Sequence, residues 1–267
     1  MDTFCYRYTL YIARDDTISL QSQSEILMRV KAVIAYRGNL FQGFQRQTST
    51  PHTITTAIET ALQTLGIESS IVGSGRTDAG VHATGQVIHF DLPPYWDNLL
   101  KLTEHLNGKL EGIAFKHITP VDSDFHARFS AQKRLYRYLF KTTNPSIFEE
   151  EFIAHLPIKN FRLLEEVLNC FVGEHDFSYF LKTGSETKNN IREVYRATTR
   201  PLGNTHAIYF EANGFLRAQV RMMVDFAIRV ANGELTLMQL REQLSLQTIH
   251  SRRLAPPEGL YLARVIY

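Results

Sequence analysis

Apolar residues recur along this chain of 267 residues with two different spacings, every second position in some stretches and every third or fourth position in others. The first spacing predicts strands and the second predicts amphipathic helices. In the first half of the chain, the predicted strands cover 30–36, 69–72 and 86–92, and the predicted helices cover 53–65 and 96–106. In the second half, the predicted strands cover 133–141, 191–199, 206–212 and 259–267, and the predicted helices cover 161–171 and 215–231.

The same alternation of short strands and helices occurs twice, which predicts an α+β fold of two halves. Each half is expected to have an antiparallel or mixed sheet with helices on one face. We place the first half at 28–122 and the second at 123–267, with the join near Thr119–Phe125.

Residues 1–27 differ in composition from the rest, with two arginines and four acidic residues. Strand-like sequence begins abruptly at Met28, so we predict that 1–27 is a poorly ordered extension. An added edge strand through Phe4–Ile12 is the alternative. The chain from Met28 onward then carries 27 basic and 23 acidic residues, a mildly positive balance.

The overall composition is typical of a soluble globular protein, with 44% hydrophobic and 21% charged residues. No apolar run approaches the ~20 residues that a membrane span needs. The two cysteines, Cys5 and Cys170, provide no ligand cluster and at most one disulfide. We therefore expect a reducing, cytoplasmic setting.

The stretch GSGRTDAGVHA at 73–83 places Arg76 and Asp78 between glycines and small residues. Glycines permit left-handed turns and close approach by another molecule. A nearby arginine favours the ionised form of an aspartate and fixes its direction. Such a carboxylate suits nucleophilic attack or deprotonation without a cofactor. A plain salt bridge within the loop is the alternative.

The glycine loop does not fit several better-known sites. It fails the dinucleotide-binding pattern, because Asp78 stands where the third glycine belongs, and it lacks the Lys-Ser/Thr ending of a phosphate-binding P-loop. His82 and His89 have no cysteine partners, which argues against zinc. Asp78 is the only acid between Ser69 and Phe90, so a two-carboxylate glycosidase would need a distant second acid.

A second informative stretch, HARFSAQKRLYRY at 126–138, has four basic residues, no acid and interleaved aromatic residues. This composition predicts a surface that contacts phosphates and stacks unpaired bases. The alternative is a solvated strand whose tyrosines pack in the core, above all Tyr138, which shares a face with Phe140.

A third stretch, GFLRAQVRMMV at 214–224, carries Arg217 and Arg221 one helical turn apart beside an apolar stripe. An arginine at the edge of the core is expected to have a carboxylate partner. Both Asp78 and Asp225 are candidates for that partner.

These stretches resemble the TruA-type tRNA pseudouridine synthases. The resemblance begins with GRTDAGVHA at 75–83 and continues through further motifs in family order across nearly all of the chain from Met28 onward. Those motifs are AYRGNLFQGFQRQ at 35–47, GQVIHF at 85–90, FHARFSA at 125–131, RLYRY at 134–138, FVGEHDFSYF at 171–180, GFLRAQVRMMV at 214–224 and APPEGLYL at 255–262.

The resemblance implies conversion of uridine to pseudouridine at nucleotides 38 to 40 of the tRNA anticodon stem-loop. It also implies a homodimer without metal or organic cofactor. The implied fold is the pseudouridine-synthase fold, in which two α+β halves join around a basic central cleft.

The resemblance also implies roles for individual residues. Asp78 is the implied catalytic aspartate, and Arg76 would hold the RNA and help to extrude the target nucleotide. Tyr136 would stack on the uracil and assist proton removal. Arg221 would pair with Asp78, and Leu260 would form an apolar wall beside it.

Four basic residues are the expected contacts to the RNA: Arg128, Lys133, Arg134 and Arg217. Phosphate contacts of this kind would supply the free energy to flip the target uridine out of the stem. Leu135 departs from the family pattern, in which an arginine is common at this position.

Two other functions compete with the enzyme. One is an RNA-binding module that has lost catalysis, although Asp78, Arg76, Tyr136 and Arg221 are all intact. The other is a different aspartate enzyme, such as a nucleoside hydrolase, which would leave the basic aromatic strand without a purpose.

Overall fold

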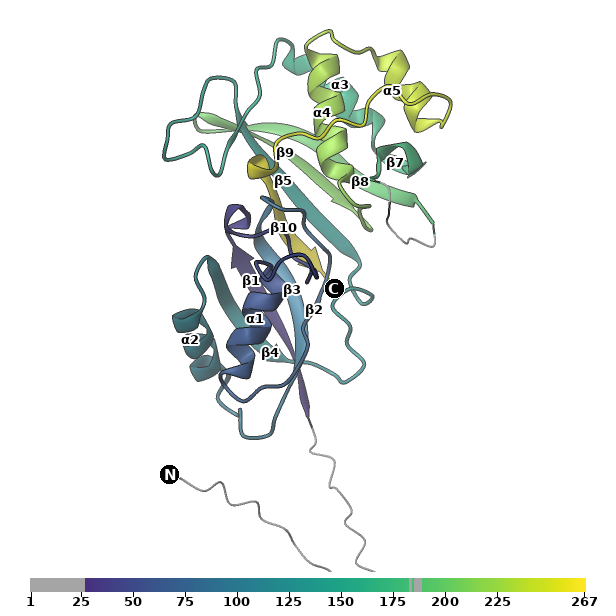
Figure 1. Ribbon diagram of the computed structural model, residues 1–267. Coiled ribbons are helices and arrows are strands. Elements are labelled where there is room, and N and C mark those ends of the chain that lie inside the picture. The colour runs from purple at the N-terminus through teal and green to yellow at the C-terminus, as the bar shows by residue number, and fades with distance from the viewer. Residues whose placement is uncertain (1–26, 183, 185–188) are drawn as a thin grey trace, which may run out of the picture.

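The computed structural model describes residues 27–182, 184 and 189–267. The strands of this part form one sheet in the order β4–β1–β3–β10–β5–β9–β8–β7, with β2 paired to β3 and β6 paired to β5 (Figure 1). The strands are β1 Met28–Tyr36, β2 Val72–Gly73, β3 His82–Leu92, β4 Ile113–Pro120, β5 Lys133–Lys141, β6 Ala154–His155, β7 Gly173–Asp176, β8 Ile191–Leu202, β9 Thr205–Ala212 and β10 Leu260–Ile266. The helices are α1 Ile54–Gln63, α2 Leu99–Lys109, α3 Phe161–Cys170, α4 Gln219–Ala231 and α5 Leu237–Leu244. The predicted α+β class is confirmed.

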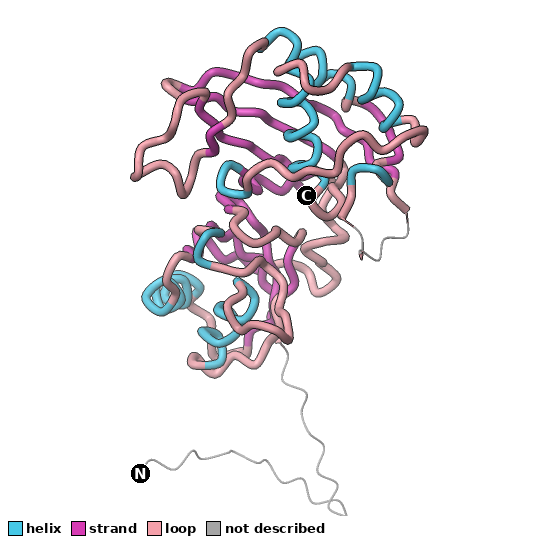
Figure 2. Tube along the Cα trace, turned by 45° about the horizontal axis from the view of Figure 1, so that its top comes forward, coloured by secondary structure: helices cyan, strands magenta, loops and turns pink. Residues whose placement is uncertain are grey.

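Figure 1 shows α1 and α2 beside β1, β3 and β4, and shows α3, α4 and α5 beside β5, β8 and β9. Figure 2 shows the same division from a second direction. The predicted extension at 1–27 lies outside the described residues except for Leu27. In the described part of the chain, no helix combines the length and apolarity that crossing a membrane requires.

The last strand of the chain, β10, connects the two groups of strands. It pairs in parallel with β3 through Tyr261 and Leu262, and it pairs antiparallel with β5. Its close approach to β3 requires Gly85, because a Cβ there would lie 2.3 Å from the Ala263 carbonyl oxygen. β10 therefore lies between β3, which follows the glycine loop, and the basic aromatic strand β5.

The alternation predicted for 133–141 is confirmed in β5. Tyr136, Tyr138 and Phe140 are buried, whereas the residues between them are only half-buried. Because successive side chains of a strand point to opposite faces, Arg134 shares the face of Tyr136 and Tyr138. Lys133 lies on the opposite face.

Two predicted helices begin later than the apolar spacing indicates. α2 starts at Leu99 rather than at 96, because the Asn98 side chain caps it by accepting a hydrogen bond from the Lys101 N–H at 2.9 Å. α4 starts at Gln219 rather than at 215, because Ala218 is left-handed at φ 61° and cannot continue an α-helix backward.

The predicted strand at 69–72 is mostly wrong, since only Val72–Gly73 pairs with a neighbouring strand. Side chains satisfy the backbone there instead: the Ile71 N–H donates to Glu59 Oε1 at 3.0 Å. The pattern also failed to predict β4 and α5. β4 is an edge strand with mostly exposed outer residues, so its apolar alternation is incomplete.

Candidate active site

The glycine loop between β2 and β3 is fixed at its start by Gln86 of β3. Ser74 Oγ donates to Gln86 Oε1 at 2.6 Å, and Gln86 Nε2 donates to the Gly75 carbonyl at 2.8 Å. These side chains are buried, and buried polar groups with satisfied hydrogen bonds hold a backbone in one conformation. The loop therefore leaves the sheet in a defined direction.

The residues on either side of Asp78 are also anchored. Thr77 Oγ1 lies 2.9 Å from the Tyr36 hydroxyl, and the Phe44 N–H donates to the Thr77 carbonyl at 3.1 Å. The Val81 N–H donates to the Asp78 carbonyl at 3.2 Å. Asp78 thus sits on a loop whose backbone is held before, at and after the carboxylate.

Gly80 explains why the loop needs a glycine immediately after Asp78 and Ala79. Its φ is +79°, and a Cβ there would lie 2.8 Å from Cγ of Pro257. The left-handed backbone and the lack of space both exclude a larger residue. Pro257 belongs to the segment that leads into β10, so this contact packs the glycine loop against the strand that connects the two halves.

The carboxylate of Asp78 faces Arg221 of α4. Their Oδ2 and Nη1 atoms are 3.6 Å apart, and the two side chains are 27% and 13% exposed. Arg221 is oriented by a second interaction, because its Nε donates to the Ala255 carbonyl at 2.7 Å. The structure therefore places an ion pair at the site that is accessible on the aspartate side and braced on the arginine side.

Two other pairings that the sequence left open, Arg221 with Asp225 and Arg76 with Asp78, are not found among the described residues. Asp225 faces Arg253 at 3.9 Å rather than Arg221. Burial raises the pKa of the Asp225 carboxyl, with the nearby arginines opposing that rise. Arg76 is exposed, and its side chain makes no hydrogen bond or ion pair with any described residue, so the plain loop salt bridge to Asp78 is absent.

Tyr136 and Leu260, the two residues expected to surround the base, are both buried. Tyr136 is 9% exposed and packs edge-to-face against Phe215 at 5.1 Å between ring centroids. Burial raises the pKa of Tyr136 to about 12; the Asp78 carboxylate adds to this rise, which puts the two groups within electrostatic reach. Tyr136 is thus a neutral phenol near pH 7. Leu260 is buried at the start of β10 opposite Tyr138.

The four basic residues expected to contact RNA are in different situations. Arg128 and Arg217 are exposed, and the Arg128 guanidinium lies 5.7 Å from the ring centroid of Phe129. Arg134 is half-buried and contacts the glycine loop, because its Nη2 donates to the Ser74 carbonyl at 3.0 Å. Lys133 is not brought to the site, because it lies on the opposite face of β5, 3.4 Å from the Glu211 carboxylate.

Sequence reasoning missed Arg192, which lies on β8 close to Arg128 and Arg134. Burial lowers the pKa of Arg192, and the positive charges of Arg128 and Arg134 lower it further. A single arginine inside a predicted strand carries no signal of its own. Only the pairing of β8 with β9, and of β9 with β5, brings it toward the site.

His82 and His89 each use Nδ1 to accept a hydrogen bond from a backbone N–H. His82 accepts a hydrogen bond from the Gly38 N–H at Nδ1, at 3.0 Å, and its Nε2 lies 3.0 Å from the Glu151 carbonyl oxygen. Both ring nitrogens are therefore occupied by backbone groups. No group of three or more potential metal ligands occurs among the residues that the structure describes.

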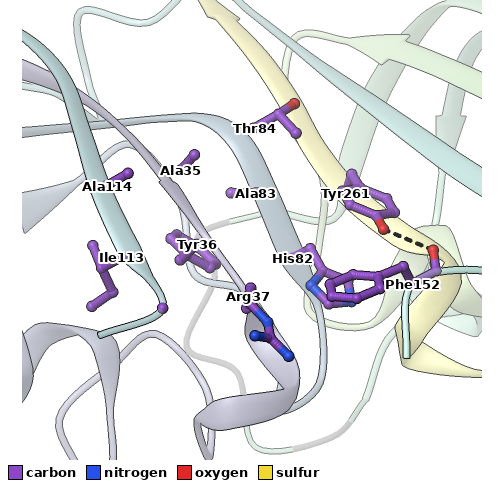
Figure 3. Close-up of a pocket in the computed structure, with 11 residues that line it drawn as sticks. Ala35, Tyr36, Arg37, His82, Ala83, Thr84, Ile113, Ala114, Phe152 and Tyr261 are labelled. Atoms are coloured by element: carbon purple, nitrogen blue, oxygen red, sulfur yellow. Dashed lines mark hydrogen bonds between the residues drawn. The ribbon is translucent and has the colours of Figure 1, made fainter. Parts of the chain in front are cut away.

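A separate hollow of about 410 Å³ is lined by residues of β1, β3, β4 and β10 (Figure 3). Tyr261 lines it, and this residue points away from the face of its neighbour Leu260. Small or aromatic side chains such as Ala35, Ala114 and Phe152 form much of the remaining wall. The lining includes none of the expected site residues.

Comparison with known proteins covers most of the chain. A family model described as tRNA pseudouridine synthase matches residues 32–130 and 168–267. A tRNA pseudouridine synthase A from Helicobacter hepaticus is 39% identical over 243 residues, which cover 89% of this chain and 98% of that protein. A protein of the same name from Wolinella succinogenes is 36% identical, over 88% of this chain and 93% of its own length. Another from Campylobacter jejuni is 34% identical, over 90% of this chain and 100% of its own length.

Proposed function

The chain belongs to the tRNA pseudouridine synthase family, and we propose that it converts uridine to pseudouridine at nucleotides 38 to 40 of the anticodon stem-loop, with Asp78 as its catalytic residue. The observation that carries this proposal is the ion pair between Asp78 and Arg221. It gives the Asp78 carboxylate a fixed direction on a glycine-flanked loop, within electrostatic reach of Tyr136.

The chemistry is an isomerisation. The bond between ribose C1′ and uracil N1 breaks, a bond from C1′ to C5 forms, the C5 proton leaves and N1 gains a proton. Substrate and product have the same atoms and oxidation state, so we propose that no metal or organic cofactor takes part. Asp78 acts either by adding to the base or by assisting departure at the sugar.

The detached uracil must turn over without escaping, and water must not reach the sugar. We assign this requirement to Tyr136 and Leu260, because both are buried and carry apolar surface. We assign Tyr136 a stacking role, since its raised pKa keeps the hydroxyl protonated near neutral pH. Arg76 is exposed on the same loop, and we assign it the role of holding the RNA strand as the nucleotide leaves the stem.

A uridine inside a stem must be flipped out of its stack, at a cost of roughly a few kcal/mol. Contacts between arginines and phosphates supply this free energy, so binding should weaken as salt increases. Arg128 and Arg217 are exposed and available for this purpose. The substrate tRNA implies that the enzyme works in the cytoplasm.

We also propose that the protein is a homodimer. The hollow around Ala35, Ala114 and Tyr261 offers an apolar surface whose lining includes none of the proposed site residues (Figure 3). A second copy placed there would leave the catalytic face free for tRNA. Sedimentation velocity of the purified protein tests this, and a monomer at micromolar concentration would contradict it.

The position assignment is tested by mapping pseudouridine in tRNA transcripts after incubation with the protein. Transcripts with uridine at 38, 39 or 40 should gain pseudouridine there, and transcripts with cytidine at the same position should not. Pseudouridine confined to another part of the tRNA would refute the anticodon assignment while leaving the family membership intact.

A further inference from the structure

Three arginines from separate segments lie within electrostatic reach of one another, and one of them, Arg134, also contacts the glycine loop at Ser74. Arg134 Nη2 donates to the Arg128 carbonyl at 2.7 Å, and its Nη1 donates to the Asn213 carbonyl at 2.8 Å. Arg192 approaches Gly214, the residue after Asn213. Its Nε would lie 3.5 Å from a Cβ added to that glycine. None of the three arginines has an ion pair with a described carboxylate. The cluster Arg128–Arg134–Arg192 is therefore positive charge without compensation.

Arg134 uses its guanidinium inside the protein. Nη1 donates to the carbonyls of Ala131 at 3.3 Å and Asn213 at 2.8 Å, and Nη2 donates to those of Ser74 at 3.0 Å and Arg128 at 2.7 Å. Each terminal nitrogen has two N–H groups, so all four terminal donors are occupied. A phosphate could bind them only by displacing backbone carbonyls.

The carbonyls that Arg134 holds belong to the segments that build the site. Ser74 begins the loop of Asp78, and Asn213 leads to Phe215, which packs against Tyr136, and then to the helix of Arg221. One planar guanidinium thus fixes three backbone segments relative to one another. A lysine at this position would keep the charge but present only three donors on one atom, without the planar fork.

Arg128 and Arg192 differ from Arg134 in having free donors. Arg192 bonds through Nη1 alone, to Asn189 Oδ1 at 3.1 Å and to the carbonyls of Asn189 and Ile191 at 3.2 and 2.5 Å. No described acceptor binds its Nε or Nη2. Arg128 is exposed, and no side-chain hydrogen bond holds its guanidinium to a described residue.

We propose that the cluster divides two tasks, with Arg134 as a positioning residue for the catalytic loop and Arg128 and Arg192 as a binding site for a phosphate of the tRNA backbone. The inference rests on the proposed function for the identity of the RNA. Like charges brought together without an acid repel one another until an anion binds between them. The backbone of the substrate is that anion.

The test compares Arg134→Lys, Arg128→Gln and Arg192→Gln with wild type in tRNA binding from 50 to 200 mM KCl and in single turnover at saturating protein. Arg128→Gln and Arg192→Gln should each weaken tRNA binding. Each should also make the negative slope of log K against log salt shallower by roughly 0.7–0.9. Arg134→Lys should keep the affinity and the slope but react roughly 100-fold more slowly, because a small displacement of the catalytic loop costs this much.

Arg162→Gln is the matched control. Arg162 lies in the first turn of α3, is 90% exposed and pairs with Glu166 of the same helix at 3.7 Å. Its neighbour Phe161 packs against His206, at the opposite end of β9 from Asn213. This variant should change neither affinity nor slope. An unchanged slope for both glutamine variants would overturn the phosphate site. A wild-type rate for Arg134→Lys would overturn the positioning role.

Arginine footprinting of the wild type with p-hydroxyphenylglyoxal avoids any folding defect of a variant. Arg128 and Arg192 should react in the free protein and become protected by tRNA, whereas Arg134 should resist modification in both states. An Arg134 that reacts readily and is then protected by tRNA would contradict the division of tasks. Footprinting and binding need no turnover, so a protein that binds tRNA but forms no pseudouridine would sink the proposed function without sinking the phosphate site.

Discussion

The Asp78 carboxylate lies 3.6 Å from the guanidinium of Arg221, although one residue comes from a loop before β3 and the other from a helix near the end of the chain. The two segments meet because β10 pairs with both β3 and β5. Arg221 is held in turn by the Ala255 carbonyl, just before β10 begins. The position of the carboxylate therefore depends on the packing of the whole sheet.

Replacing Arg221 by methionine should reduce pseudouridine formation by roughly 100-fold, because Asp78 loses the group that orients it. Binding of tRNA should change much less than the rate, since Arg221 is only 13% exposed. Single-turnover kinetics at saturating protein separates the two effects. Asp225→Asn is the matched control, since its carboxylate faces Arg253; loss of rate in that variant equal to that of Arg221→Met would argue against the pairing.

Tyr136→Phe should keep much of the activity if Tyr136 acts by stacking, because phenylalanine retains the ring. Its pKa of about 12 predicts that this group adds no ionisation to the rate profile between pH 7 and 9. Tyr136→Ala should lose far more activity, since it leaves a cavity beside Phe215. A phenylalanine variant as inactive as the alanine variant would assign the hydroxyl a chemical role.

Gly80→Ala should lower the free energy of unfolding by about 1–3 kcal/mol, because its left-handed backbone and the Pro257 contact both resist a Cβ. Gly108→Ala is the matched control. Gly108 lies inside α2 with nothing within 4 Å of the new methyl, so alanine should stabilise the protein by about 0.5–1 kcal/mol. Urea denaturation of both variants checks the contrast, and equal effects would contradict the steric account.

His89 predicts a loss of stability in mild acid. Burial lowers its pKa to about 4, and its Nδ1 accepts a hydrogen bond from the Ala127 N–H at 3.0 Å. The unfolded chain takes up this proton near pH 6.5, so the stabilisation is present above that value and is lost as the pH falls toward 4. His89→Gln should flatten the dependence of unfolding free energy on pH in this window, measured by urea denaturation. A variant with the same slope as wild type would assign the slope to other groups.

The strands of the sheet were largely predictable because their periodicity is a local property. The alternation of β5 and the stripe of α3 follow directly from the spacing of apolar residues. The helix starts were less predictable, because each depends on one residue and not on a repeated pattern. Asn98 caps α2 with its side chain, and Ala218 has a left-handed backbone before α4. The boundary we place at 122–123 between the halves remains a prediction.

The candidate site shows the same limit. The glycine loop and its aspartate stand out in the sequence, but the choice between Asp78 and Asp225 as partner of Arg221 depends on tertiary packing. Lys133 and Arg134 are neighbours with similar charge, yet the pleat sends them to opposite faces. Arg192 carries no local signal at all, and only the order of the strands brings it to the cluster.

The central claim is that the protein forms pseudouridine with Asp78 as its catalytic residue. Release of tritium from tRNA labelled at uracil C5 tests this claim most directly. Wild type should release tritium, and Asp78→Asn should fold, bind tRNA and release at least roughly 1000-fold less. Asparagine nearly matches aspartate in size, and tRNA binding by Asp78→Asn checks that a folding defect does not explain the loss. Equal release by Asp78→Asn would remove Asp78 from its catalytic role. Tight binding without release by wild type would make this chain a silent RNA-binding member of its family.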